Sequence, residues 1–154
     1  MMALLSKNTY VSIKPEKPRF KVVNKTTKID LSICTISDSE ILREGIYSVF
    51  QDEIDVTNMV LTSKNVFFDK HAKSNFDVVI TDIEFVDGID TSFIKQIKSI
   101  SPETRIIVYT SPKNRDRRIR AMEYGAEFFI FFDDSFKLLE FIVKRMVTKP
   151  ISID

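Results

Sequence analysis

Three polar residues that could share one site each stand at the end of an apolar run. They are Asp38, Asp82 and Thr110. Two neighbouring carboxylates repel one another, and a hard cation such as Mg²⁺ relieves that repulsion while it also binds phosphate oxygens. Asp82 could then attack a phosphorus atom, and the Thr110 hydroxyl could contact the phosphoryl group. Taken singly, each residue is also a common helix cap or strand end.

These residues can meet only if the strands before them are neighbours. Short apolar runs alternate with segments whose apolar residues recur at helical spacing, which predicts a parallel sheet covered on both faces. We expect a flavodoxin-like (βα)5 doubly wound α/β fold with strand order 2-1-3-4-5, in which the three strand ends form one crevice. The expected strands are 31–36, 59–61, 76–81, 104–109 and 127–132, and the expected helices begin after Asp38 or Ser39 or lie at 64–73, 93–100, 112–124 and 135–147.

The composition indicates one domain with a basic N-terminal extension. The 154 residues suffice for one domain, and the 44% that are hydrophobic can form a core. Residues 1–30 carry a net charge of +5, whereas the remainder carries −4. We therefore divide the chain into an extension at 1–30 and a domain at 31–149, and the alternation at 10–13 favours a short extra strand.

Several features narrow the class of protein. Cys34 is the single cysteine, so no internal disulfide can form, and we expect a buried thiol in a reducing compartment. No apolar stretch approaches the roughly 20 residues of a membrane span, so we expect a soluble, cytoplasmic protein without membrane contact. Because no phosphate loop or nucleophile elbow is present, we do not expect an enzyme. His71 lies in a polar segment and is expected at the surface.

Residues 31–147 resemble the receiver domain of two-component response regulators, closest to those of the DNA-binding NarL/LuxR type. The resemblance covers about three-quarters of the chain, and all three glycines fall at glycine positions of the family pattern. It implies a signalling module with the fold expected above. The segments that carry it are ISDSEILREG at 36–45, VVITDI at 78–83, DG at 87–88, SP at 101–102, IIVYTS at 106–111 and YGAE at 124–127.

The resemblance implies roles for five residues. Asp82 matches the phospho-accepting aspartate, Asp38 the direct metal ligand of an acidic pair, and Glu84 the residue whose backbone carbonyl binds the metal. Thr110 matches the hydroxyl that senses the phosphoryl group, and Phe129 matches the aromatic residue that changes rotamer with it.

Two positions depart from the family pattern. Ser37 stands where the family has its first acid, and Phe132 stands where it has a lysine that gives the phosphoryl group a positive charge. A charged contact of that kind contributes substantially in a partly buried site. We therefore expect weakened Mg²⁺ binding, slow or absent phosphotransfer to Asp82, and a switch at Thr110 that is uncoupled from output.

The sequence thus favours a divergent receiver that regulates transcription through protein–protein interaction, independently of phosphorylation. The family uses helix 4, strand 5 and helix 5 for dimerisation and output, which makes Arg117, Arg120 and Phe136 candidate interaction residues. The expected partner is a second copy or another regulator, with a histidine kinase as a further candidate, and DNA is reached only indirectly. Two alternatives stay open: a working phospho-acceptor using Asp82 with Mg²⁺, and a nucleic-acid binder using the basic N-terminal arm and helix 4.

Overall fold

A parallel sheet forms the centre of the molecule in the computed structural model, which describes residues 11–13, 30–53 and 55–148. Its parallel strands lie in the order β3-β2-β4-β7-β8. Counted along the chain this is the order 2-1-3-4-5, so the flavodoxin-like prediction is confirmed. The strands are β2 (Leu31–Ile36), β3 (Val56–Thr62), β4 (Val78–Thr81), β7 (Arg105–Thr110) and β8 (Ala126–Phe131).

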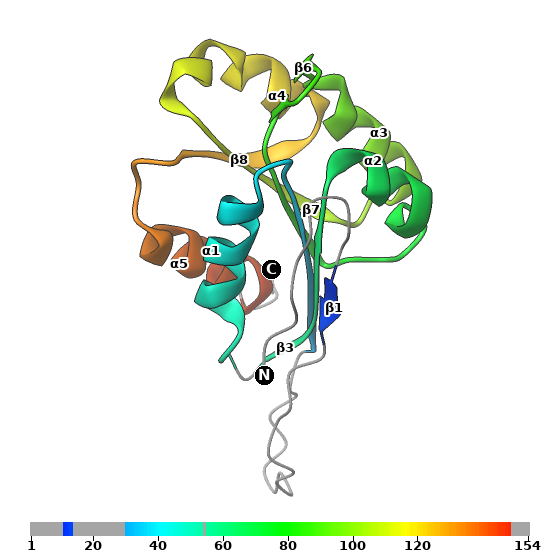
Figure 1. Cartoon of the computed structure of the whole chain (residues 1–154), viewed down its shortest axis with the longest axis vertical. Helices are drawn as coiled ribbons and strands as arrows, with labels where there is room; N and C mark the ends of the chain where they lie inside the picture. The colour runs from blue at the N-terminus through cyan, green and yellow to red at the C-terminus, as the bar shows by residue number, and fades with distance from the viewer. Residues whose placement is uncertain (1–10, 14–29, 54, 149–154) are drawn as a thin grey trace, which may run out of the picture.

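Helices cover both faces of this sheet. The helices α1 (Glu40–Phe50) and α5 (Phe136–Thr148) lie side by side on one face (Figure 1). The other face is covered by α2 (Lys64–Val66) with its π-helical continuation η1 (Phe67–His71), by α3 (Ser92–Ile100), and by the 3-10 segment η2 (Pro112–Arg117) leading into α4 (Arg118–Tyr124). No helix in the described ranges has both the length and the apolar character that a membrane crossing requires.

The alternation of side chains along each strand divides the core into two halves. In β2, Ile33 packs under α1 and α5, whereas the next residue, Cys34, packs on the face that α3 and α4 cover. Strands that are buried on both faces must be apolar at nearly every position, which explains the continuous apolar runs in the sequence. Cys34 is fully buried, as expected, and burial raises the pKa of its thiol.

A short antiparallel strand extends the sheet beyond β3. This strand, β1 (Val11–Ile13), pairs with β3 so that Val11 lies opposite Leu61 and Ile13 opposite Met59. The extra strand predicted at 10–13 is therefore confirmed for 11–13. The rest of the basic extension lies outside the described residues, and the boundary predicted at residue 30 stays a prediction.

Two local features differ from the expectations. The segment after Asp82 forms a small antiparallel hairpin of β5 (Glu84–Phe85) and β6 (Gly88–Ile89). The surface position expected for His71 is wrong, because its side chain is buried at 7% exposure, with its ring 6.5 Å from that of Phe76. The polar residues that precede His71, Asp69 and Lys70, are exposed to solvent. The His71 ring instead lies near the buried ring of Phe76.

Gly125, which ends α4, provides a test of this packing. It has a φ of +127°, and a Cβ there would lie 2.6 Å from Cγ of Lys98, whose amino group is held by two backbone carbonyls. We expect Gly125→Ala to lower the free energy of unfolding by about 2 kcal/mol in urea denaturation. Gly88→Ala is the matched control, since Gly88 has a φ of +123° but open space around a Cβ. Equal losses in both variants would mean that the Lys98 contact is unimportant.

Candidate functional site

The carboxylate of Asp82 is buried at the end of β4 and is held by three donors. Its Oδ1 accepts hydrogen bonds from the backbone amides of Ile83 at 2.7 Å and Glu84 at 3.0 Å, and from the Thr110 hydroxyl at 2.7 Å. Burial raises the pKa of Asp82, and the three donors act in the opposite direction. Because β4 and β7 are adjacent, the structure brings Asp82 and Thr110 together as the sequence predicted.

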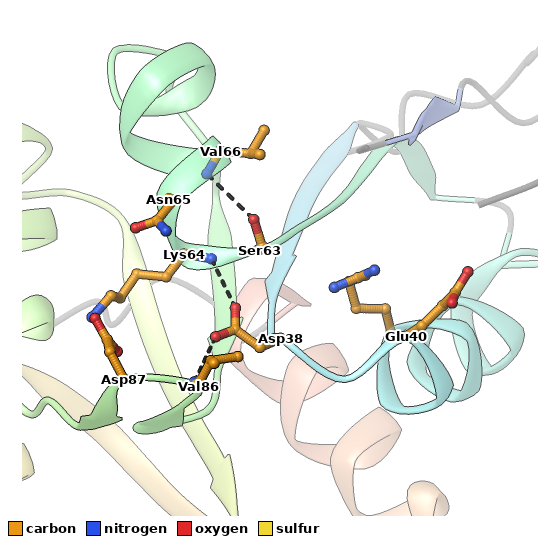
Figure 2. A pocket seen from close by; sticks show the side chains of 9 residues that line it. Asp38, Glu40, Ser63, Lys64, Asn65, Val66, Val86 and Asp87 are labelled. Carbon is orange, nitrogen blue, oxygen red and sulfur yellow. Dashed lines mark hydrogen bonds and ion pairs between the residues drawn. The ribbon is translucent and has the colours of Figure 1, made fainter. Parts of the chain in front are cut away.

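Asp38 lies at the same edge of the sheet but binds other partners. Its Oδ2 accepts a hydrogen bond from the Val86 amide at 2.8 Å, and its Oδ1 accepts a longer one from the Lys64 amide at 3.4 Å. Figure 2 shows the carboxylate between these two amides. The Lys64 amino group adds an ion pair to Asp90 at 3.2 Å. Asp38 therefore fastens the β5–β6 hairpin and the start of α2 to the loop after β2.

A buried arginine, which the sequence reasoning missed, shapes the loop next to Asp38. Arg43 is 1% exposed, and its Nη1 donates a hydrogen bond to the Ser37 carbonyl at 2.6 Å. The guanidinium also borders a cavity of about 580 Å³ between this loop, the start of α2 and the hairpin. Burial lowers the pKa of Arg43, and nearby carboxylates act against that shift. The signal was its helical spacing from Ile46 and Phe50, which places Arg43 on the buried face of α1.

The donor set at this edge does not fit a Mg²⁺ site. Mg²⁺ demands oxygen ligands in near-ideal octahedral geometry, so hydrogen bonds that orient a carboxylate elsewhere oppose its binding. The Ser37 hydroxyl accepts a hydrogen bond from the Ser39 amide at 3.0 Å, and both oxygens of Asp38 accept hydrogen bonds from backbone amides. Within the described part of the chain, no group of three His, Cys, Asp or Glu side chains is placed to hold a metal. The metal roles of Asp38, Asp82 and Glu84 stay predictions.

Asn114 joins Thr110 to Glu84 and was not anticipated from the sequence. Its Nδ2 donates to the Thr110 hydroxyl oxygen at 2.9 Å and to Oε1 of Glu84 at 3.1 Å. The Lys113 amino group contacts Oε2 of Glu84 at 3.0 Å, and the contacts with Asn114 and Lys113 lower the pKa of Glu84. An asparagine near a helix start is ordinary in sequence, so only the meeting of the segments at Glu84 and at 110–114 reveals this bridge.

The charge of Asp82 is not compensated by a cation within the described part of the chain. Among the described residues, no lysine or arginine forms an ion pair with this carboxylate, and the charge that acts on it most is the repelling Glu84.

Phe132 packs its ring against Tyr109 at a centroid distance of 5.2 Å and is 39% exposed. Phe129 is half-buried beside Phe131, on the face that α3 and α4 cover.

The three predicted interaction residues lie over different faces of the sheet. Phe136 packs against Tyr109 and against α1, where a Cβ on Gly45 would lie 2.9 Å from its ring. Arg117 and Arg120 lie in η2 and α4, over the opposite face of the sheet. Whether any of the three contacts a partner stays a prediction.

Comparison with solved structures shows where this fold recurs. The beryllofluoride-activated DrrB receiver domain has a TM-score of 0.68 and 19% identity over 79% of this chain and 100% of that chain. A two-component response regulator from Clostridium difficile has a TM-score of 0.68 and 13% identity over 80% of this chain and 100% of that chain. The beryllofluoride-activated NtrC4 receiver domain dimer has a TM-score of 0.65 and 21% identity over 77% of this chain and 97% of that chain. The chain covers 54% of the longer DrrB regulator from Thermotoga maritima, with 18% identity over 79% of this chain and a TM-score of 0.65.

Sequence comparison identifies the family. No curated protein sequence matches the chain. The family model described as the response regulator receiver domain matches residues 33–133, which is more than half of the chain. The similarity to the NarL/LuxR type within that family stays a prediction. The matched residues include most of β2 and all of β4, β7 and β8, with the Asp82–Thr110 pair, and this chain belongs to the response regulator receiver domain family.

Proposed function

We propose that this receiver domain acts through protein–protein contacts and does not need phosphorylation to do so. The observation that carries the proposal is the hydrogen bonding of Asp38 next to Ser37, at the carboxyl end of β2. Ser37 replaces one acid, and both oxygens of Asp38 accept backbone amides. A metal ion would have to compete with those amides, which orient both oxygens of Asp38, so we expect only weak Mg²⁺ affinity.

The electrostatics around Asp82 support the same proposal. A phosphoryl group adds close to two negative charges. Glu84 already repels the Asp82 carboxylate, and Phe132 offers no positive charge where the family has a lysine. The phosphorylated state therefore lacks the compensation that a charged group in a partly buried site requires.

The edge formed by α4, β8 and α5 is the proposed contact surface. It carries exposed apolar side chains at Ile119, Phe128, Leu138 and Phe141. Arginines and aromatic residues are enriched in protein interfaces. We expect a second copy of the chain or another regulator to bind here, and the similar NtrC4 receiver domain is described as a dimer. The exposed arginines of η2 and α4 are Arg115, Arg117, Arg118 and Arg120.

A working phospho-acceptor is the second candidate. Thr110 donates to Oδ1 of Asp82, and Oδ2 accepts no hydrogen bond from the described residues. An open carboxylate oxygen is what attack on phosphorus requires. This candidate differs from the first in one measurable respect, namely a saturable response to a phosphoryl analogue.

Titration with Mg²⁺ and beryllofluoride, followed by NMR, separates the two candidates. We expect no saturable chemical-shift change at Asp82 and Thr110 at millimolar concentrations, because the metal ligands and the cation are missing. The variant Ser37→Asp/Phe132→Lys restores the family residues and should gain a response. Saturable shifts in the wild-type chain that vanish in Asp82→Asn would instead establish the phospho-acceptor.

The buried Asp82 carboxyl also predicts a pH dependence of stability. Its pKa is raised in the folded protein, so the folded state holds its proton to a higher pH than the unfolded chain does. The free energy of unfolding should therefore fall as pH rises from the unfolded pKa through the folded pKa. Asp82→Asn removes this loss and should be more stable than wild type at pH 7 in urea denaturation. A stability difference that does not shrink below about pH 4 would contradict the assignment.

Charge reversal tests the proposed contact surface. Arg117 and Arg120 have only loose ion pairs, at 3.9 Å to Asp116 and 3.7 Å to Glu123. If a second copy binds here, Arg117→Glu/Arg120→Glu should weaken self-association at least tenfold in analytical ultracentrifugation. Lys73→Glu, an exposed position outside η2 and α4, is the control. A chain that remains monomeric at high concentration would exclude the second copy as the partner.

A further inference from the structure

A buried polar chain runs from the start of η2 to the Asp82 carboxylate. Asn114 is 3% exposed and Thr110 is fully buried. The amide nitrogen of Asn114 can only donate, so the Thr110 oxygen must accept from it, and the one hydroxyl proton of Thr110 is left for Asp82. The direction of both hydrogen bonds, from Asn114 to Thr110 to Asp82, is therefore fixed by chemistry.

The same amide nitrogen of Asn114 donates a second hydrogen bond. Its second contact is with Glu84, at 3.1 Å, and Glu84 follows Asp82 by two residues. Lys113 holds the other oxygen of Glu84 at 3.0 Å, so neighbouring residues of η2 grip one carboxylate. The ends of β4 and β7 and the start of η2 are thus closed into a ring of hydrogen bonds.

The backbone at Asn114 is adapted to this bridge. Its φ of −96° and ψ of 16° are non-helical and interrupt the segment between Pro112 and α4. The backbone amide of Asn114 donates to the Ser111 carbonyl at 2.9 Å, which keeps the side chain next to the strand end. The position of the arginines that follow therefore depends on where Asn114 is held.

We propose that Asn114 is a positioning residue that locks the Thr110 hydroxyl onto Asp82 without any phosphoryl group. The lock fixes the start of η2 and, through it, the exposed arginines of η2 and α4 in one arrangement. This inference rests on the proposed function, since it explains how a contact surface can be held in one state when phosphorylation is not used.

The side-chain rotamer of Thr110 provides the test, measured in the full chain by NMR three-bond couplings to its methyl carbon. We expect a single χ1 rotamer in the wild type. In Asn114→Ala and Asn114→Leu the hydroxyl loses its donor, so the couplings should average between rotamers. Amide hydrogen exchange at 113–120 should accelerate about tenfold, because one buried bridge of typical strength is removed.

Lys113→Ala is the matched control, because it removes the ion pair with Glu84 but leaves the bridge from Asn114 in place. It should keep the single Thr110 rotamer. If the Asn114 variants do not fold, Glu84→Ala breaks the same bridge from its other end and should release Thr110 in the same way. A single unchanged rotamer in every folded variant that lacks the bridge overturns the proposal.

The test of the Asn114 lock and the test of the proposed function use different measurements. The rotamer is measured without Mg²⁺ or beryllofluoride, whereas the proposed function is judged by the response to them. A fixed rotamer in the Asn114 variants with a silent beryllofluoride titration would overturn the lock alone. A saturable beryllofluoride response with a released rotamer would overturn phosphorylation independence alone and support the lock.

Discussion

The hydrogen bond from Thr110 to Asp82 exists because a carboxylate buried at the end of a strand must find donors. Burial raises the free energy of its charged form, and only hydrogen bonds or opposite charges can offset that cost. Here two backbone amides and one hydroxyl supply the donors at 2.7–3.0 Å. The adjacency of β4 and β7 makes the third of these available, so the strand order and the chemistry of the site depend on each other.

Both carboxylates at this edge are stabilised by neutral donors. Asp82 binds amides of its own loop and Thr110, while Asp38 binds amides of Val86 and Lys64. Neutral donors are sufficient to hold one negative charge at each position. Neutral donors supply no positive charge that could offset a phosphoryl group, which is consistent with the proposed independence from phosphorylation.

The two faces of the sheet carry different kinds of side-chain contact near the site. On the face under α1 and α5, Tyr109, Phe132 and Phe136 form an aromatic cluster beside Gly45. On the other face, the bridge made by Asn114 connects the site to η2 and α4. Hydrogen bonds therefore connect Asp82 with the start of η2.

The sequence alone determined the fold, because strand and helix periodicity are local and the receiver pattern recurs along most of the chain. It also predicted that Asp82 and Thr110 lie together and that Cys34 is buried. Ser37 and Phe132 were noted from the sequence as departures from the family pattern. The tertiary structure decided the partners of Asp38, the burial of His71, and the bridge at Asn114. Those partners lie up to 48 residues apart, as Asp38 and Val86 do. No local pattern encodes which loops meet, because that meeting is set by how the whole sheet packs.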